Sequence, residues 1–118
     1  MIHVDGSCLK NPGGPGGWAA VLAYGAVVKE ISGGEPVTTS NRMELVAACR
    51  ALEALKRPCD VVLYTDSQYV QLGMTLWTRT WQRTGRLACG QVANADLWAR
   101  LIEAAKPHAV DWRWIRGH

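Results

Sequence analysis

The stretch Val61-Val62-Leu63-Tyr64-Thr65-Asp66-Ser67 decides the fold. Its first four residues form a short apolar run, which is typical of a central strand covered on both faces. Ser67 then offers a cap for a second, short helix, which we expect to run through Leu72 and to end at Gly73. A strand that leads directly into a helix predicts a crossover unit of an α/β sheet. Asp66 then lies at the carboxyl end of the strand.

The residues before this unit predict an antiparallel meander. Ile2–Val4 reads as a first strand that ends at Asp5-Gly6. The mostly apolar run Trp18–Val28, broken at Gly25, predicts a second strand, and Lys29–Gly33 predicts its hairpin partner. Gly33-Gly34-Glu35-Pro36 is rich in turn residues, so we expect the sheet segment to end there.

A long helix is predicted over Met43–Lys56, with caps offered by Thr39-Ser40-Asn41 and a stop at Pro58. Its buried stripe consists of Leu45, Ala48, Cys49, Leu52 and Leu55. Downstream we expect a third helix over Thr75–Arg83, a loop over Gly85–Val92, a fourth helix that opens at Asn94 or Asp96 and ends before Pro107, and a final strand over Val110–Ile115. This order predicts an α/β fold with a mixed sheet, in which a meander is followed by parallel crossovers.

Length and composition predict one domain over residues 1–118, with 48% hydrophobic residues. No apolar run approaches about 20 residues, and the first residues do not resemble a signal peptide, so we expect no membrane contact. The cysteines at positions 8, 49, 59 and 89 form no Cys-x-x-Cys pair, which favours reduced thiols and a cytoplasmic protein. His3, His108 and His118 are scattered, which argues against a zinc site.

One stretch of the chain combines basic and aromatic side chains. No acidic residue lies between Asp66 and Asp96, and the net charge is +3. The stretch contains Trp77, Arg79, Trp81, Arg83 and Arg86. This pattern is typical of a nucleic-acid surface, although a solvated helix with two core tryptophans is the alternative.

Three carboxylates stand out by their position. Asp5 ends the first strand, Asp66 ends the central strand, and Glu44 lies near the start of the long helix. Ligands gather at the carboxyl ends of parallel strands, so these groups meet if the two strands are neighbours. Clustered carboxylates favour Mg²⁺ or Mn²⁺, and two such ions suit phosphodiester hydrolysis. Alternatively, Asp5 is a turn residue, Glu44 an acid favoured in a first helical turn, and Asp66 a helix cap.

Five blocks of sequence resemble the bacterial type 1 ribonuclease H family, in the family's order and spacing. They are Asp5-Gly6-Ser7-Cys8 with Asn11-Pro12-Gly13, Thr38-Thr39-Ser40-Asn41-Arg42-Met43-Glu44-Leu45, Tyr64-Thr65-Asp66-Ser67-Gln68-Tyr69-Val70, Asp96-Leu97-Trp98, and Trp114-Ile115-Arg116-Gly117-His118. A lone Asp-Gly-Ser is a weak signal, but five ordered blocks are specific. The resemblance implies a ribonuclease H-like fold, with a five-stranded mixed sheet flanked by helices. It also implies endonucleolytic hydrolysis of the RNA strand of RNA–DNA hybrids, which leaves 3′-hydroxyl and 5′-phosphate ends.

The resemblance also implies roles for single residues. Asp5, Glu44 and Asp66 correspond to three of the family's four metal-binding acids, with two Mg²⁺ ions, replaceable by Mn²⁺, as cofactors. The positions that match contacts to the RNA strand are Gly6, Cys8, Asn11, Asn41 and Gln68. Those that match contacts to the DNA strand are Thr39, Trp77 and Asn94. The stretch with Arg79, Trp81, Arg83 and Arg86 resembles the family's basic protrusion, with fewer basic residues than in the best-known members.

The resemblance breaks off at His118, which is the histidine of the family's Gly-His pair. Family members continue through a loop with a mobile histidine into a helix that carries the fourth metal-binding aspartate. We therefore expect a C-terminally short catalytic domain with three of the four acids. No obligate protein partner is expected, although the surface left by a missing helix could favour a dimer.

Two other functions stay open. The first is a module that binds RNA–DNA hybrids with little or no cleavage, because the fourth acid is absent. The second is the ribonuclease H part of a larger polymerase, against which the helix motif and the basic protrusion argue.

Overall fold

The computed structural model describes residues 1–9 and 13–116, so Asn11, Gly117 and His118 lie outside the described residues. The strands are β1 (Ile2–Cys8), β2 (Gly14–Tyr24), β3 (Val27–Thr38), β4 (Asp60–Thr65) and β5 (Ala109–Trp114). The helices are α1 (Ser40–Glu53), α2 (Gln68–Leu72), the π-helical turn η1 (Gly73–Trp77), α3 (Thr78–Thr84) and α4 (Ala95–Ala105). In the described ranges, no helix has the length and apolar character needed to span a membrane.

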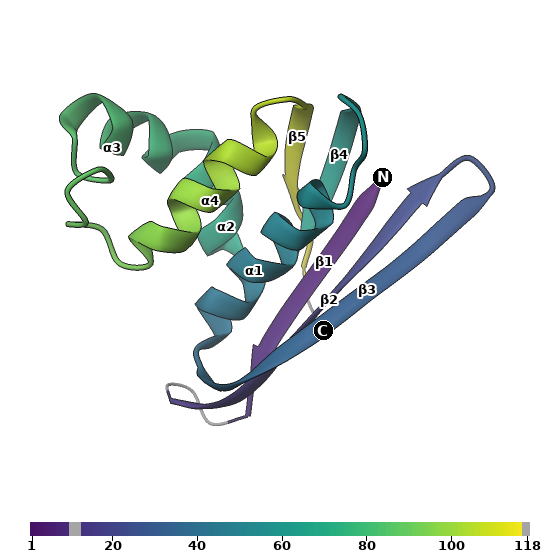
Figure 1. The fold of residues 1–118 in the computed structure, drawn as a ribbon, viewed down its shortest axis with the longest axis horizontal. Coiled ribbons are helices and arrows are strands. Elements are labelled where there is room, and N and C mark those ends of the chain that lie inside the picture. The colour runs from purple at the N-terminus through teal and green to yellow at the C-terminus, as the bar shows by residue number, and fades with distance from the viewer. Residues whose placement is uncertain (10–12, 117–118) are drawn as a thin grey trace.

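The strands form one five-stranded mixed sheet in the order β3-β2-β1-β4-β5 (Figure 1). β1 pairs antiparallel with β2 and parallel with β4, and β5 pairs parallel with β4. α1 packs on β1 and β2, and α4 packs on α1. This is the predicted α/β architecture, with the meander placed before the crossovers.

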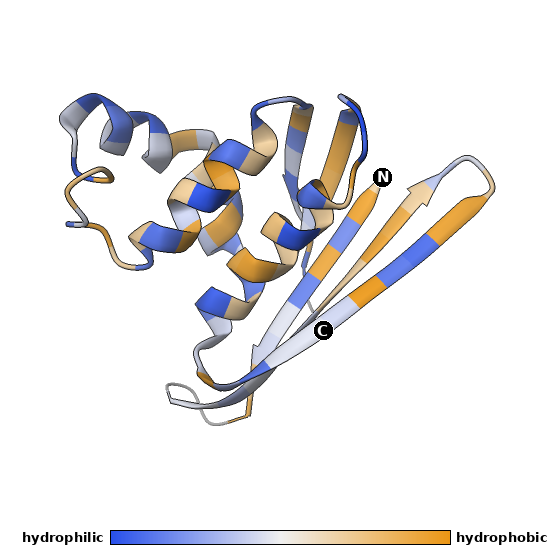
Figure 2. Cartoon of the chain, in the orientation of Figure 1, coloured by the Kyte–Doolittle hydropathy of each residue, from blue (hydrophilic) through white to orange (hydrophobic). Residues whose placement is uncertain are grey.

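The first strand is amphipathic, as Figure 2 shows by the alternation of hydrophobic and hydrophilic residues along β1. Ile2 and Val4 are buried on the side of α1, whereas His3 and Asp5 are exposed. β4 repeats this pattern, because Val61 and Leu63 are buried while Val62 and Tyr64 are half-buried. The prediction that β4 is covered on both faces was therefore wrong for the face that carries Val62 and Tyr64.

The boundaries of the meander differ from the prediction. The turn lies at Gly25, so Val27 and Val28 belong to β3 rather than to the second strand. Gly33-Gly34-Glu35-Pro36 does not end the sheet, because β3 continues to Thr38. β3 can include Pro36 because it is an edge strand. On its outer side no neighbouring strand needs the backbone N–H that proline lacks.

The helices also differ in detail. α1 begins at Ser40, three residues before the predicted start, and ends at Glu53, before the predicted end at Lys56. α2 ends at Leu72, as predicted, but Gly73 does not stop the helical path, since it keeps helical dihedral angles and leads through η1 into α3. A Cβ atom on Gly73 would collide with the ring of Trp98. This glycine therefore serves close packing rather than helix termination.

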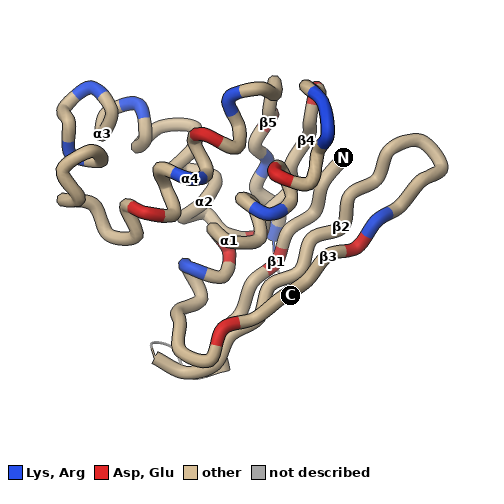
Figure 3. The backbone as a smooth tube through the Cα atoms, viewed as in Figure 1, with Lys and Arg blue, Asp and Glu red and all other residues tan. Residues whose placement is uncertain are grey.

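α3 and the loop after it carry positive charge. Figure 3 shows Lys and Arg, without Asp or Glu, along this part of the chain. Arg79, Arg83 and Arg86 are all exposed. Trp77 and Trp81 are half-buried, and the ring of Trp81 contacts that of Trp98 with centroids 5.4 Å apart. The arginines are thus exposed to solvent, whereas the two tryptophans are partly covered by the protein, Trp81 by the buried Trp98.

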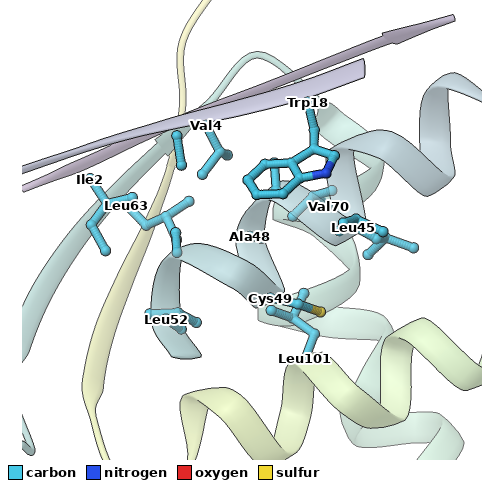
Figure 4. Close-up of a cluster of buried hydrophobic side chains, with 14 of the residues drawn as sticks. Ile2, Val4, Trp18, Leu45, Ala48, Cys49, Leu52, Leu63, Val70 and Leu101 are labelled. Carbon is cyan, nitrogen blue, oxygen red and sulfur yellow. The ribbon is translucent and has the colours of Figure 1, made fainter. Parts of the chain in front are cut away.

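The core lies between the sheet and α1, and it extends to α4 (Figure 4). α1 contributes four residues of the predicted stripe, all of them buried, whereas Leu55 lies beyond the end of α1 and is half-buried. Leu63 comes from β4 and Leu101 from α4, and both side chains are fully buried. Cys49 lies in this core, and burial raises the pKa of its thiol to about 12. Cys49, Cys59 and Cys89 are free thiols, as predicted.

Candidate active site

The parallel pairing of β1 and β4 places two carboxylates next to each other. The ladder joins Ile2 to Leu63 and Val4 to Thr65, and Asp5 and Asp66 are the next residues on their chains. Both therefore lie where the shared ladder ends, at the carboxyl end of β4. The condition under which Asp5 and Asp66 were expected to meet, that these two strands are neighbours, is therefore fulfilled.

The third carboxylate reaches the same place from α1. Thr39 caps this helix, since its hydroxyl accepts the backbone N–H of Arg42 over 3.1 Å. The first turns of α1 then pass directly over Gly6 of β1. A Cβ atom on Gly6 would lie 2.5 Å from the carbonyl carbon of Met43 and 2.6 Å from the nitrogen of Glu44. Only glycine allows this approach, which brings Glu44 to the strand ends.

Asp5, Glu44 and Asp66 form one cluster, in which each offers an oxygen within 4.8 Å of the others. Glu44 is buried, with 6% of its surface exposed, while Asp66 is half-buried and Asp5 is exposed. The group contains neither cysteine nor histidine, so its ligands are hard oxygens that suit Mg²⁺ or Mn²⁺ better than zinc. A site that is buried at one acid and open at another can hold an ion and admit a ligand.

The buried member of the cluster has a perturbed acidity. Burial raises the pKa of Glu44 to about 8, and the negative charges of Asp66 and Asp5 add to this rise. The Gly6 N–H, which donates to Glu44 Oε1 over 3.0 Å, acts in the opposite direction. Carboxylates that repel one another in this way gain stability from a divalent cation, which replaces the proton. The electrostatics thus fit a metal site.

A second group of residues holds these acids in place, and no role was predicted for it from the sequence. The Thr65 hydroxyl lies 3.5 Å from Glu44 Oε2 and accepts the backbone N–H of Ser67 over 3.0 Å. The indole of Trp114 donates to the backbone oxygen of Asp66 over 2.9 Å. Thr65 is fully buried. The alternation of β4 gives a signal for this burial, because Thr65 shares a face with Val61 and Leu63.

Four of the residues predicted to contact RNA lie on the elements that carry this cluster or directly after them. Gly6 directly follows Asp5, while Asn41 and Gln68 are exposed near the first turns of α1 and α2. The Cys8 thiol donates to the backbone oxygen of Thr38 over 3.4 Å, so it ties the end of β1 to the end of β3. Asn11 lies outside the described residues. The structure therefore brings four of the five predicted positions to the same end of the sheet.

The residues predicted to contact DNA lie at the start of α1, at the start of α4 and at the end of η1. Asn94 precedes α4, and its amide contacts Arg42 of α1 and Tyr69 of α2. Trp77 is half-buried, and its ring meets that of Tyr69 edge-on, with centroids 6.0 Å apart. From Trp77 the chain continues into α3 with its arginines (Figure 3). A series of contacts thus links these residues: Arg42 contacts both Thr39 and Asn94, and Tyr69 contacts both Asn94 and Trp77.

Comparison with known proteins identifies relatives of the whole chain. The model of the RNase H family matches residues 1–118. A ribonuclease H from Rhodopseudomonas palustris (strain TIE-1) is 56% identical over 120 residues, which cover 100% of this chain and 77% of the relative. A ribonuclease H from Granulibacter bethesdensis (strain ATCC BAA-1260 / CGDNIH1) is 60% identical over 119 residues, which cover 99% of this chain and 79% of the relative.

Solved structures resemble this fold as well. LC9-RNase H1, described as a type 1 RNase H with the type 2 active-site motif, has a TM-score of 0.85 and 37% sequence identity. The match covers 99% of this chain and 62% of that one. LC11-RNase H1, whose crystal structure is a complex with an RNA/DNA hybrid, shares the fold with a TM-score of 0.71 and 20% identity.

The cluster of acids at the ends of β1 and β4 thus lies in a chain that matches one family model along its whole length. More than half of its residues are identical to those of bacterial ribonucleases H. On both grounds, the protein belongs to the RNase H family.

Proposed function

We propose that this chain hydrolyses the RNA strand of RNA–DNA hybrids and leaves 3′-hydroxyl and 5′-phosphate ends. The observation that carries the proposal is the meeting of Asp5, Glu44 and Asp66 within 4.8 Å in a member of the RNase H family. Isolated acids in these positions have ordinary structural explanations. Three acids from separate elements around one point repel one another when all are ionised, and a divalent cation relieves that repulsion.

The cofactors that fit this site are two Mg²⁺ ions, with Mn²⁺ as a substitute. Asp5, Glu44 and Asp66 would hold them, since carboxylate oxygens are the ligands that these cations prefer. When bound, such ions activate a water molecule and stabilise the leaving oxygen of a phosphodiester. Glu44 can bind a metal ion only after it loses its proton. Because its pKa is raised to about 8, the side chain keeps this proton at neutral pH in the metal-free chain. Gly6 fixes the position of that carboxylate by its N–H.

Selectivity for a hybrid would follow from two groups of residues. The exposed amides of Asn41 and Gln68 lie near the acids, where they would bind 2′-hydroxyl groups of the RNA strand. Thr39, Asn94 and Trp77 would bind the backbone of the DNA strand, and Arg79, Arg83 and Arg86 would neutralise phosphates farther along. These contacts read the type of strand and not its sequence.

The test is an incubation of the chain with labelled RNA–DNA hybrid and Mg²⁺ or Mn²⁺, beside single-stranded RNA, duplex RNA and duplex DNA. Metal-dependent cleavage of the RNA strand in the hybrid alone is the expected result. Analysis of the fragment ends checks the 3′-hydroxyl and the 5′-phosphate. Tight binding of the hybrid without cleavage under either metal would instead indicate a hybrid-binding module.

A further inference from the structure

Asn94 has an unusual conformation. It is the N-cap residue of α4, yet its side chain makes no capping hydrogen bond. Its backbone is left-handed, with φ 59° and ψ 31°, and across residues 1–9 and 13–116 no other non-glycine residue has a positive φ. Asparagine tolerates this region better than most residues, but the conformation still costs about 1 kcal/mol or more. The amide of Asn94 is therefore not used to cap α4, and its partners lie elsewhere.

Two neighbours fix the orientation of this amide. Arg42 Nη1 donates to Asn94 Oδ1 over 3.2 Å, and Asn94 Nδ2 donates to the Tyr69 hydroxyl over 3.1 Å. A guanidinium can only donate, so the oxygen of the amide must face Arg42 and the nitrogen must face Tyr69. One hydrogen on Nδ2 is used by Tyr69. The other remains as a donor.

These two neighbours are themselves anchored. Asp96 accepts two hydrogen bonds from Arg42, at 3.2 Å from Nη1 and 3.0 Å from Nη2. Tyr69 also accepts the indole N–H of Trp98 over 3.1 Å, and Trp98 is fully buried. Both hydrogens of Arg42 Nη1 are thus occupied, one by Asn94 and one by Asp96. The carboxylate of Asp96 neutralises the guanidinium and fixes its plane.

Arg42 also anchors a second polar group. Its backbone N–H donates to the Thr39 hydroxyl, which keeps its own hydrogen as a donor. The main chain of one residue therefore holds Thr39 while its side chain holds Asn94. Each of these two groups keeps one donor hydrogen for a ligand, and a phosphodiester offers two anionic oxygens as acceptors.

We propose that Arg42 and Asp96 are positioning residues. They orient the Thr39 hydroxyl and the Asn94 amide so that both donate hydrogen bonds to one phosphate of the DNA strand. The inference rests on the proposed function, because it assigns these donors to the hybrid. It separates Arg42 from Arg79 and Arg83, which are exposed and belong to none of the ion pairs found among the described residues. Arg42 acts through Asn94 and not as a direct counter-charge to DNA.

The chain contains a matched control for this proposal. Arg100 and Glu53 form a second two-bond ion pair between α1 and α4, with distances of 2.8 and 2.6 Å. Asp96→Ala and Glu53→Ala each remove one such pair from the same two helices. Only Asp96→Ala releases Arg42 and Asn94. Loss of helix packing alone would affect both variants alike.

The experiment combines the variants with hybrids in which single DNA phosphates are replaced by uncharged methylphosphonates. In the parent chain and in Glu53→Ala, a methylphosphonate at one DNA position should raise both Kd and KM by roughly tenfold. A change of this size corresponds to the loss of one charge-assisted hydrogen bond. Asp96→Ala should raise KM for the unmodified hybrid by a similar factor. In that variant the methylphosphonate penalty at this position should largely vanish, while kcat stays within about twofold.

Three results would overturn the positioning role. They are an equal rise of KM in both alanine variants, a full methylphosphonate penalty in Asp96→Ala, and a parent chain without any sensitive DNA phosphate. Kd is measured without metal, so the penalty is readable even if the chain does not cleave, and failure of the proposed function stays distinguishable. If Asp96→Ala does not fold, Tyr69→Phe removes the other anchor of the amide and should give the same loss of penalty.

Discussion

The backbone N–H of Gly6 donates to Glu44 Oε1 over 3.0 Å, so the first strand holds the buried carboxylate of the first helix. The contact exists because glycine lets α1 approach β1 closely. It offers Glu44 one strong hydrogen bond in a place where burial and two neighbouring acids oppose its charge. This pair of residues thus contributes both to the position of the Glu44 carboxylate and to the packing of α1 on β1.

Gly6→Ala should destabilise the chain by about 1–3 kcal/mol, the usual cost of inserting a carbon into a packed contact. The new Cβ atom would be 2.5 Å from backbone of α1, which cannot yield as a side chain can. Urea unfolding monitored by circular dichroism measures the change. Gly17→Ala is the control, because its nearest atom lies at 3.6 Å. Equal stability of the two variants would contradict the close approach.

Glu44→Gln should change how stability depends on pH in metal-free buffer. The pKa of Glu44 is about 8 in the folded chain, and an unfolded glutamate titrates near about 4.3. Between these values the folded chain holds a proton that the unfolded chain has released, so stability falls as pH rises through this window. The glutamine variant lacks this loss. Its stability relative to the parent should therefore increase from pH 5 to 8 and level off above.

The measurement is the urea midpoint at several pH values in the presence of a chelator. Glu103→Gln is the control, since that side chain is 69% exposed and paired with Lys106 at the surface. Parallel pH profiles for Glu44→Gln and the parent would show that Glu44 is ionised throughout. Added Mg²⁺ should remove most of the pH dependence, because the ion displaces the proton.

Asp66→Asn should reduce cleavage of the hybrid by on the order of 100-fold or more, because it deletes a proposed metal ligand while keeping the size of the side chain. Hybrid binding should remain measurable by fluorescence anisotropy. Asp60→Asn is the control at the opposite end of β4, where the side chain is exposed. Full activity of Asp66→Asn would remove this residue from the metal site.

Arg83→Ala and Trp77→Ala should weaken hybrid binding in different ways. Loss of Arg83 would remove one proposed phosphate contact, so the slope of log Kd against log salt should fall by roughly 0.9. Loss of Trp77 would remove a proposed uncharged contact with the backbone of the DNA strand, so affinity should fall at an unchanged slope. In both variants KM should change more than kcat. Arg57→Ala, an exposed cation on the loop after α1, should leave both quantities as they are.

Much of the site could be predicted because its residues occupy special places in local structure. Asp66 follows an apolar run and precedes a helix cap, which defines a strand end without any tertiary information. Ser67 does cap α2 through the N–H of Val70, as expected. The meeting of Asp5 with Asp66 required one further assumption, that β1 and β4 are neighbours, and the register confirms it.

Other features depend on contacts that sequence patterns do not reveal. Gly33 and Gly34 read as a stop, yet β3 passes through them because Gly33 leaves room for the Trp18 ring and Gly34 for the backbone of Gly16. Gly73 likewise reads as the end of all helical structure, but the chain stays helical there, and glycine is required because the ring of Trp98 leaves no room for a Cβ atom. The link between Arg42 and Asn94 joins two segments far apart in the chain, so neither neighbourhood signals it.

The register that joins Ile2 to Leu63 has a consequence for how the protein folds. The β2–β3 hairpin and α1 can form from nearby residues, whereas this parallel pairing must first close a long loop of chain. Such non-local contacts form slowly, since the entropy of closure is lost before any contact offsets it. A chain emerging from the ribosome cannot bring Asp5 to Asp66 until β4 has been synthesised. The acids therefore stay apart throughout early synthesis, and the site comes into being only when the sheet is closed at its centre.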